Sequence, residues 1–335
     1  MRISIITVVG LGLGFLLTSA CGPAGSKSNL PPEQRVVTIG TGAELLSGLI
    51  FLADEQGWFA KQGLTAKVRD YPSGKLAYEA LQRGEVPVVA CATLPIAVGG
   101  LAQQDLRVLA VIGTTANEMR IVGRRDRGIT QPGDLRGKRI ATQPASALHF
   151  FLHLFLLRHN VAEDTVVVSF VSPEQLAHAV TSGGVDAAVV REPITSATVA
   201  ALGTNAVVFS APGFYEKYYL LVTRRDFLER QPATLTAILR GLVAAAESAK
   251  HAPAVAQAMV AQRIGTGLTA VQADWPWADF RVTLPQAVVL VLENEARWVV
   301  RTGGTNGIGR VPDYLALINW SLLEQVQPEA VTIIR

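Results

Sequence analysis

Hydroxyl side chains stand at four predicted helix starts: Thr41, Ser73, Thr93 and Ser146. The first three follow short runs that read as strands, so they lie where a strand ends and a helix begins. Free backbone N–H groups and the helix dipole make such a position favourable for an anion. We therefore expect these hydroxyls, with the neighbouring Gly74 and Ala147, to contact a small ligand. Because Ser and Thr also cap helices without any ligand, a purely structural role stays open for each of them.

Arg191 and Glu192 come directly after the predicted strand 186–190. The planar guanidinium of Arg191 can hold a sulfonate or a carboxylate through two parallel hydrogen bonds. The same side chain can instead pair with Glu192 or with a neighbouring loop. Tyr218 offers a hydroxyl or a ring wall, although packing in the core is an equal alternative. Arg191, Glu192 and Tyr218 are therefore further candidates for the ligand site.

His149 and His153 lie four residues apart in a predicted helix, a spacing that metal ligands use. No Cys or carboxylate stands nearby in the sequence as a third ligand, so we expect no metal site. His149 belongs to the segment that opens the helix, and we interpret it as a ligand contact.

The sequence lacks the motifs that would indicate an enzyme. There is no G-x-S-x-G elbow, no Walker loop and no G-x-G-x-x-G after the first predicted strand. Cys91 lies in an apolar run and is expected to be a small buried hydrophobe rather than a nucleophile. We therefore predict binding without chemistry and without a cofactor.

Alternating strand-like and helix-like segments must position these residues. The order β-α-β-α-β over 36–112, and again over 138–209, predicts two α/β lobes, each a mostly parallel sheet flanked by helices. Long helical patterns fill the chain from residue 232 onward. We expect crossovers near 117–122 and 218–223. Residues 35–117 and 223–335 then form lobe 1, residues 118–222 form lobe 2, and a ligand cleft lies between them.

The first 34 residues form a separate unit. Residues 1–20 have the charged, apolar and small-residue order of a secretory signal peptide, and Cys21 directly follows the cleavage site. We expect lipidation at Cys21, with residues 21–34 as a flexible, lipid-anchored tether rich in Gly, Ser and Pro. Simple secretion is the alternative. The formal net charge of +3 is small, and no basic stripe points to nucleic acid.

Four segments carry a family resemblance: 53–64, 73–86, 134–141 and 184–193. They resemble, in register, the ABC-transporter substrate-binding proteins of the nitrate/sulfonate/taurine group, which includes binders of thiamine-precursor pyrimidines. The resemblance implies the two-lobe periplasmic-binding-protein type II fold. It also implies capture of a small solute by lobe closure and delivery to an ABC permease in the inner membrane. We expect a lipid-anchored monomer in the periplasm or at the cell surface, and no enzyme.

Two other classes of protein remain open. One is an enzyme on the same fold that acts on a small organic acid or a pyrimidine; the export signal argues against it. The other is a ligand-sensing subunit that reports to a membrane receptor. For the solute, the hydroxyl-capped helix starts and Arg191 favour a sulfonate-like organic anion, followed by nitrate or bicarbonate and then by heteroaromatic compounds.

Overall fold

The computed structural model describes residues 31, 35–303 and 310–334. The predicted signal peptide, lipidation at Cys21 and nearly all of the tether lie outside the described residues. Within the described ranges, no helix has the length and apolar character needed to cross a membrane.

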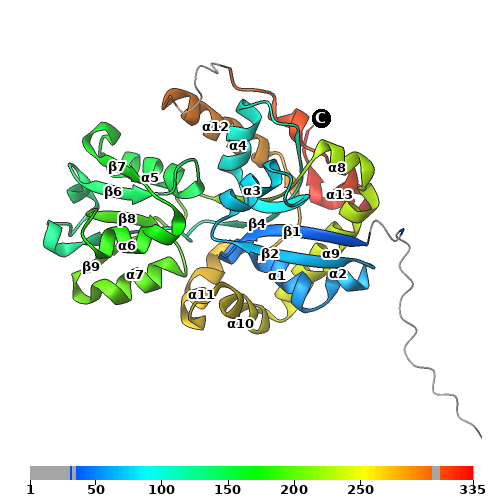
Figure 1. Ribbon diagram of the computed structural model, residues 1–335, viewed down its shortest axis with the longest axis horizontal. Coiled ribbons are helices and arrows are strands. Elements are labelled where there is room, and N and C mark those ends of the chain that lie inside the picture. The colour runs from blue at the N-terminus through cyan, green and yellow to red at the C-terminus, as the bar shows by residue number, and fades with distance from the viewer. Residues whose placement is uncertain (1–30, 32–34, 304–309, 335) are drawn as a thin grey trace, which may run out of the picture.

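Two sheets stand side by side, each with helices packed on its faces (Figure 1). Among the described residues, the first sheet has six strands in the order β11-β4-β10-β3-β1-β2, and the second has five in the order β7-β6-β8-β5-β9. The strands of the first sheet are β1 (Val36–Gly42), β2 (Thr65–Tyr71), β3 (Val88–Ala92), β4 (Leu106–Thr115), β10 (Lys217–Arg224) and β11 (Ala278–Asp279). Those of the second are β5 (Arg120–Arg124), β6 (Arg139–Thr142), β7 (Val167–Phe170), β8 (Ala187–Val190) and β9 (Ala206–Phe209). The predicted two-lobe α/β architecture is confirmed.

The expectation of a mostly parallel sheet in each lobe was wrong, because each sheet is mixed around a parallel core of three strands. Strand β1 runs parallel to β2 and β3, and β6 runs parallel to β7 and β8. One antiparallel strand is added to each core: β10 pairs with β3 and β4, and β5 pairs with β8 and β9. Strands β5 and β10 are the first strands after the chain has passed from the other lobe. A parallel neighbour is reached through a helical crossover on the same sheet, and neither of these two strands is reached in that way.

The chain passes between the sheets twice. It leaves the first sheet after Thr115 and enters the second at Arg120, then returns between Phe209 and Lys217. The second crossing was expected at 218–223, and this was wrong, because those residues lie inside β10. They are extended and apolar since β10 is buried throughout most of its length at the centre of the first sheet. We propose lobe boundaries near residues 117 and 216.

The helices are divided between the two lobes. Lobe 1 contains α1 (Gly48–Glu55), α2 (Trp58–Lys61), α3 (Gly74–Gln82), α4 (Thr93–Leu101) and, after β10, α8 (Arg225–Arg230), α9 (Pro232–His251), α10 (Pro253–Ile264), α11 (Leu268–Asp274), α12 (Ala287–Arg301) and α13 (Ser321–Val326). Lobe 2 contains α5 (Ala147–Arg158), α6 (Leu176–Thr181) and α7 (Ile194–Leu202). In the C-terminal part of the chain, two short strands, β12 (Leu284–Pro285) and β13 (Val331–Thr332), pair with each other. The C-terminal helices return to lobe 1, where α12 packs on α4 and α9 packs on α1, α2 and α13.

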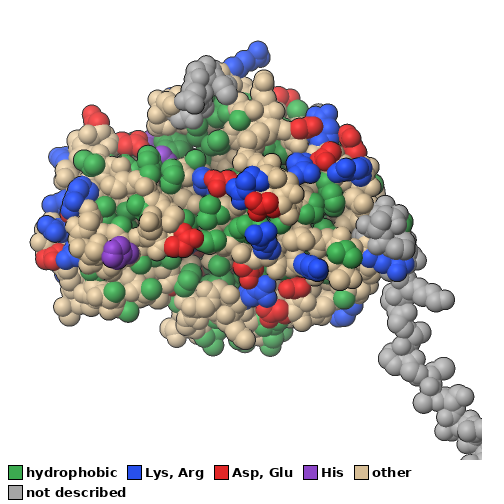
Figure 2. Space-filling view, viewed as in Figure 1, with side chains coloured by type: hydrophobic (Ala, Val, Ile, Leu, Met, Phe, Trp, Pro, Cys, Tyr) green, Lys and Arg blue, Asp and Glu red, His purple; other side chains and the backbone are tan. Residues whose placement is uncertain are grey.

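Apolar burial explains which segments form the sheets. Strands β3 and β8 are buried at every position, and both are continuous runs of small apolar residues: Val, Ala and Cys in β3, and Ala and Val in β8. Strand β2 lies at an edge and is largely exposed or half-buried, in keeping with its mixed sequence. On the face shown in Figure 2, basic and acidic side chains lie beside one another on both lobes, as the small net charge predicts.

Candidate solute-binding site

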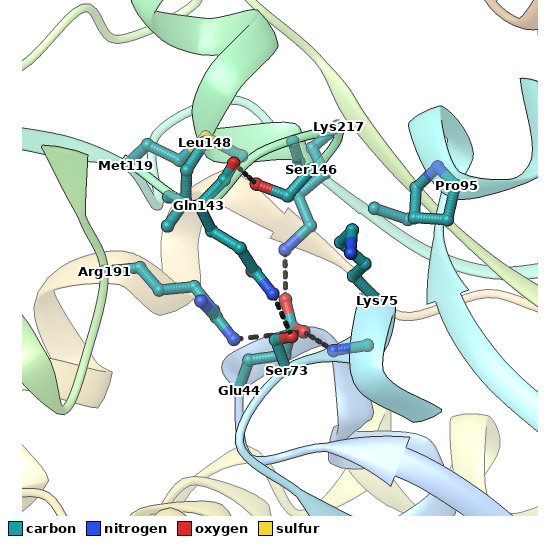
Figure 3. A pocket seen from close by; sticks show the side chains of 13 residues that line it. Glu44, Ser73, Lys75, Pro95, Met119, Gln143, Ser146, Leu148, Arg191 and Lys217 are labelled. Carbon is teal, nitrogen blue, oxygen red and sulfur yellow. Dashed lines mark hydrogen bonds and ion pairs between the residues drawn. The ribbon is translucent and has the colours of Figure 1, made fainter. Parts of the chain in front are cut away.

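A small cavity lies between the lobes, where β1 and β3 end and where α3 and α5 begin (Figure 3). We call it the charged cavity; its lining includes Glu44, Ser73 and Gly74 from lobe 1, and Gln143, Ser146 and Arg191 from lobe 2. Its free volume is about 20 Å³, which is close to the space one water molecule needs. The lobes are therefore in the closed arrangement around this point.

The carboxylate of Glu44 is the centre of the charged cavity. Its Oε1 atom accepts hydrogen bonds from the backbone N–H of Gly74 (3.2 Å), from the Tyr219 hydroxyl (3.2 Å) and from Arg191 Nη2 (3.3 Å). Its Oε2 atom accepts from Lys217 Nζ. Burial alone would raise the pKa of this carboxyl, but the charges of Arg191 and Lys217 outweigh burial and lower the pKa to about 2. The Glu44 side chain is therefore a fully ionised anion held by donors of both lobes.

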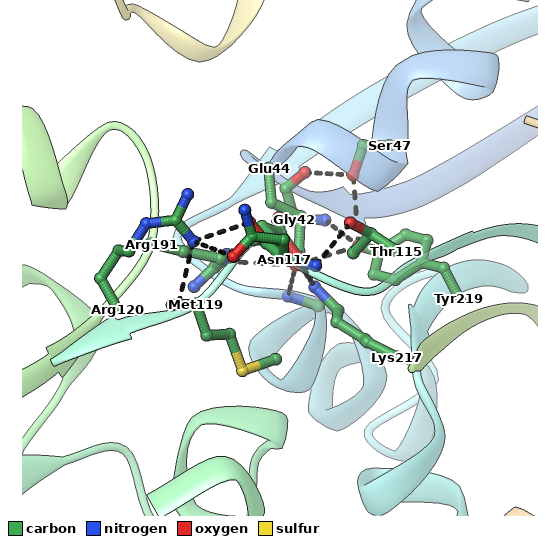
Figure 4. A network of polar contacts seen from close by, with 12 residues as sticks. Gly42, Glu44, Ser47, Thr115, Asn117, Met119, Arg120, Arg191, Lys217 and Tyr219 are labelled. Carbon is green, nitrogen blue, oxygen red and sulfur yellow. Dashed lines mark hydrogen bonds and ion pairs between the residues drawn. The ribbon is translucent and has the colours of Figure 1, made fainter. Parts of the chain in front are cut away.

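A second carboxylate, that of Glu118, balances the charges around Lys217. Figure 4 shows Lys217, Glu44 and Arg191 of the same cluster. Lys217 Nζ also donates to Glu118 Oε2 at 2.6 Å, and Glu118 Oε1 lies 4.0 Å from Arg191 Nε. All four side chains are at most 5% exposed. Burial would lower the pKa of Arg191, but Glu44 and Glu118 raise it above its ordinary value. Two formal negative charges thus meet two formal positive charges in the same buried cluster.

Glycines bring the backbone close enough to make these contacts. A Cβ atom on Gly74 would lie 2.9 Å from the Tyr219 hydroxyl and 3.0 Å from Cys91 Cα. A Cβ atom on Gly42 would lie 2.4 Å from Gly74 N and 2.5 Å from Glu44 Oε1. Only glycine at both positions lets the first N–H of α3 reach the Glu44 carboxylate.

Direct contacts between the lobes surround the cluster. Gln143 Nε2 donates to Ser73 Oγ at 2.9 Å, and Arg191 Nη2 lies 3.5 Å from the carbonyl oxygen of Pro72. Further out, Thr266 Oγ1 donates to Glu192 Oε2 at 3.2 Å. The closed arrangement is therefore held by these polar contacts, which a solute could replace, together with ring contacts between α5 and α12.

The structure brings five of the candidate residues together around the charged cavity: Ser73, Gly74, Ser146, Ala147 and Arg191. Ser73 caps α3 by accepting from the N–H of Leu76 (3.3 Å) and also meets Gln143, so its cap and cleft positions coincide. Ser146 is turned back and donates to the Gln143 carbonyl at 2.8 Å. Thr41 lies beneath the cavity, where its hydroxyl meets Ser47 at 2.8 Å and Tyr219 at 3.3 Å.

The other candidates lie away from the charged cavity. Thr93 donates to Glu295 of α12 at 2.8 Å, and Tyr218 donates to Glu216 at 3.1 Å. The Glu192 carboxylate accepts from Ser196 N and Thr266 near the start of α7. Each of these side chains thus has a partner outside the cavity.

His149 also points elsewhere. Its ring packs edge-on against Phe170 and Trp298, at 4.9 and 4.8 Å between ring centres, and burial lowers its pKa to about 4. His153 instead meets the Glu163 carboxylate at 2.8 Å. Within the described ranges, no group of three His, Cys, Asp or Glu side chains could hold a metal ion.

Sequence reasoning missed Glu44, Lys217, Glu118 and Gln143. A usable signal was present: Glu44 stands within the otherwise apolar stretch 43–46, and Lys217 begins an extended apolar run. An isolated charge inside a buried segment needs a buried partner, and such partners gather at binding sites.

The chemistry that this arrangement of donors offers is the binding of an anionic group. Cys91 does not add a nucleophile, because burial raises the pKa of its thiol well above the ordinary value.

Two lobes closed over a buried charged cluster define the architecture of a two-lobe solute-binding protein. The structure of the alkanesulfonate-binding protein SsuA from Xanthomonas axonopodis pv. citri, bound to MOPS, has the same fold. Its TM-score is 0.70 at 19% identity, and the match covers 85% of this chain and 98% of that one. Residues 47–256, more than half of the chain, match the model of the NMT1/THI5-like family. The chain belongs to this family.

Two curated relatives extend the comparison. The chain is 26% identical over 198 residues to the taurine-binding periplasmic protein of Escherichia coli (strain K12). The aligned residues cover 57% of this chain and 60% of that protein. It is 24% identical over 245 residues to a Bacillus subtilis (strain 168) protein named for binding aliphatic sulfonates, with 72% of each chain covered. The match thus spans less than two thirds of the taurine-binding relative. The predicted resemblance to sulfonate- and taurine-binding proteins is confirmed.

Proposed function

We propose that this chain is the solute-binding component of an ABC importer, which captures a small organic sulfonate between its lobes and delivers it to a permease. The names of the two relatives support this class of solute. The closed lobes and their polar contacts support capture by closure.

One observation carries the proposal: the Glu44 carboxylate lies where four donors of the cleft converge. A helix N-terminus, a guanidinium, an ammonium and a hydroxyl are the groups that hold a sulfonate equally well. We infer that the sulfonate of the solute replaces the Glu44 carboxylate when the lobes open and close again. In this closed arrangement the free volume of about 20 Å³ leaves no room for an organic sulfonate beside Glu44, which favours such an exchange.

The charge count of the cluster narrows the solute further. Glu44 and Glu118 already balance Arg191 and Lys217, so an added sulfonate leaves one buried negative charge without a partner. An uncompensated buried charge costs several kcal/mol. A solute that also carries an ammonium group restores the balance by pairing with the displaced Glu44. We therefore propose an amino-alkanesulfonate in preference to a simple anion.

Titration calorimetry with taurine and ethanesulfonate tests this function, because the two solutes share a sulfonate and differ by the ammonium group. We expect taurine to bind at least tenfold more tightly. Nitrate, bicarbonate and a thiamine-precursor pyrimidine serve as controls and should bind more weakly than taurine. A tight pyrimidine complex with no sulfonate binding would overturn the proposal.

Placement at the membrane is part of the same proposal. We propose that residues 1–20 direct export, that Cys21 carries the lipid, and that the folded monomer remains tethered outside the cytoplasmic membrane. Mass spectrometry of the mature protein tests this: we expect an acylated N-terminal Cys21 that the Cys21→Ser variant lacks. An unmodified Cys21 in the secreted protein would instead show simple secretion.

We also propose binding without turnover. The Lys217 ammonium is engaged by the carboxylates of Glu44 and Glu118, and burial raises the pKa of the Cys91 thiol well above its ordinary value. Incubation of saturating taurine with the protein, followed by mass spectrometry of the solute, should return taurine unchanged. Loss of taurine with time would point to an enzyme.

A further inference from the structure

A second and larger cavity opens between α5 and α12, with a volume of about 790 Å³. We call it the aromatic groove, after six of its lining residues: Phe150, His153, Phe214, Tyr215, Tyr218 and Trp298. Its walls come from both lobes and from the segment that returns to β10. None of the residues that line it lines the charged cavity. Its size falls in the range of cavities that hold small organic molecules.

Ring contacts fix the walls of the aromatic groove. Phe150 meets Trp298 edge-on at 5.2 Å between ring centres, and it meets Tyr215 edge-on at 5.6 Å. Such contacts hold three rings in defined orientations without any ligand. The groove therefore offers a preformed apolar surface for a flat molecule.

Two buried polar atoms of residues that line the groove lack hydrogen-bond partners among the described residues: Glu295 Oε2 and Trp298 Nε1. Glu295 is 0% exposed and Trp298 is 2% exposed. The two residues are three positions apart on α12, so they lie on the same face of the helix, and both line the groove. A buried polar atom without a partner is costly, and a pair of them in one cavity indicates a group that a ligand supplies.

The surroundings of Glu295 decide what that group must be. Its Oε1 atom accepts from Thr93 at 2.8 Å and from Tyr215 at 3.2 Å, and no cation pairs with it among the described residues. Burial raises the pKa of this carboxyl to about 8, so the acid is mostly neutral at pH 7. Because Oε1 is used as an acceptor, the proton lies on Oε2. Glu295 Oε2–H and Trp298 Nε1–H are then both donors, and they require an acceptor.

We propose that the aromatic groove is a second binding site, which takes a flat aromatic molecule with an uncharged hydrogen-bond acceptor such as a carbonyl oxygen. The acceptor receives hydrogen bonds from Glu295 and Trp298, and the rings of Phe150 and Tyr215 contact the flat body. This site is independent of the sulfonate proposed for the charged cavity.

Equilibrium dialysis with 2-acetylnaphthalene and 2-ethylnaphthalene tests the proposal, since these probes are nearly equal in shape and only the first has an acceptor. We expect 2-acetylnaphthalene to bind at least tenfold more tightly. Trp298→Phe should reduce this preference severalfold while it keeps an aromatic wall. Glu295→Gln should preserve it, because the amide still donates.

A pair of variants on α12 locates the site. Val291 lines the groove, whereas Leu290 is exposed, so Val291→Trp should fill the cavity and weaken binding of 2-acetylnaphthalene at least tenfold, and Leu290→Trp should leave it unchanged. Circular dichroism verifies that both variants are folded. Equal binding of the two probes, binding of neither, or binding that Val291→Trp leaves intact would overturn the proposal.

Discussion

The charged cavity and the aromatic groove differ in what they lack. In the charged cavity every formal charge is matched and only about 20 Å³ is free, and we propose that Glu44 occupies the position that the sulfonate of the solute takes. The aromatic groove has about 790 Å³ of open space and two buried polar atoms without partners among the described residues. Glu118 Oε1 and Arg191 Nε in the charged cluster also lack hydrogen-bond partners among the described residues, but there the formal charges are matched. The two regions therefore differ in charge balance and in free space.

This difference teaches that the two regions bind by different routes. In the proposed exchange, a solute of the charged cavity displaces the Glu44 carboxylate, so its measured affinity is the difference between the binding of two anions. A ligand of the aromatic groove displaces only solvent, so its affinity reports the new contacts directly. Substitutions that alter the internal charge balance should therefore have large effects on the first region and small effects on the second.

The largest effect should come from Lys217→Met. It removes the cation between two buried carboxylates and leaves a net negative charge in the cluster, which costs about 3–5 kcal/mol. Urea unfolding measures the loss. The double variant Lys217→Met/Glu118→Gln restores the charge balance and should recover most of it. A loss below about 1 kcal/mol for the single variant would break the contrast between the two regions.

A large pH dependence is expected from Glu295 in the aromatic groove. Burial raises its pKa to about 8 in the folded protein, whereas the unfolded chain ionises near the ordinary value of 4.5. Between these two values the folded state holds a proton that the unfolded state has released, so stability falls as pH rises, by up to about 1.4 kcal/mol per pH unit. The loss is complete above the folded pKa and is absent below the unfolded one. Thermal unfolding from pH 5 to pH 8 measures the slope.

The Glu295→Gln variant isolates this contribution from the other groups near α12, such as the His153–Glu163 pair. It should unfold with a flatter pH dependence than the natural chain and should gain relative stability at pH 8. Parallel pH profiles for the two proteins would mean that Glu295 is ionised in the fold.

An intermediate effect is expected from Gly74→Ala. The added Cβ would clash with the Tyr219 hydroxyl and with Cys91 Cα, which forces the start of α3 away from Glu44. We expect a loss of about 1–3 kcal/mol in unfolding free energy, with weaker taurine binding. Gly133→Ala is the matched control, because nothing lies within 4 Å of a Cβ at that position. Equal effects in the two variants would contradict the tight approach seen at Gly74.

The smallest effect should come from Gln143→Ala. It removes the 2.9 Å hydrogen bond to Ser73 between the lobes, a net contribution of about 1 kcal/mol. Taurine affinity should fall severalfold, because the closed form loses a contact that the open form does not make. Calorimetry against Gln272→Ala, an exposed residue of α11, provides the comparison. A stronger effect at Gln272 would contradict the role of Gln143 in closure.

Local patterns were enough to predict much of the fold and part of the charged cavity. Ser73 and Gly74 follow a strand and open a helix, so their place at the cleft follows from strand-to-helix order alone. Arg191 was predicted in the same way, from its position after β8. These residues are determined by short-range sequence, which is why they could be found.

Long-range pairing and helix rotation could not be predicted from the sequence. Glu44 and Lys217 are 173 residues apart in the chain, and nothing local indicates that they meet. His149 lies in α5, which is so apolar around its circumference that the pattern does not reveal which face meets the cleft. The aromatic groove likewise joins α5, α12 and the segment before β10, which only the tertiary fold brings together.

The exchange of one anion for another is tested most directly by calorimetry on Glu44→Gln with taurine and ethanesulfonate. Loss of the internal negative charge leaves the cluster with one excess positive charge. We predict that ethanesulfonate then binds at least tenfold more tightly than to the natural chain, whereas taurine loses its advantage because its ammonium group has lost its partner. Glu247→Gln, at an exposed position of α9 outside the lining of the charged cavity, should change neither affinity. Weakening of both solutes by the same factor in Glu44→Gln would show that Glu44 contacts the solute without being displaced, and would contradict the exchange.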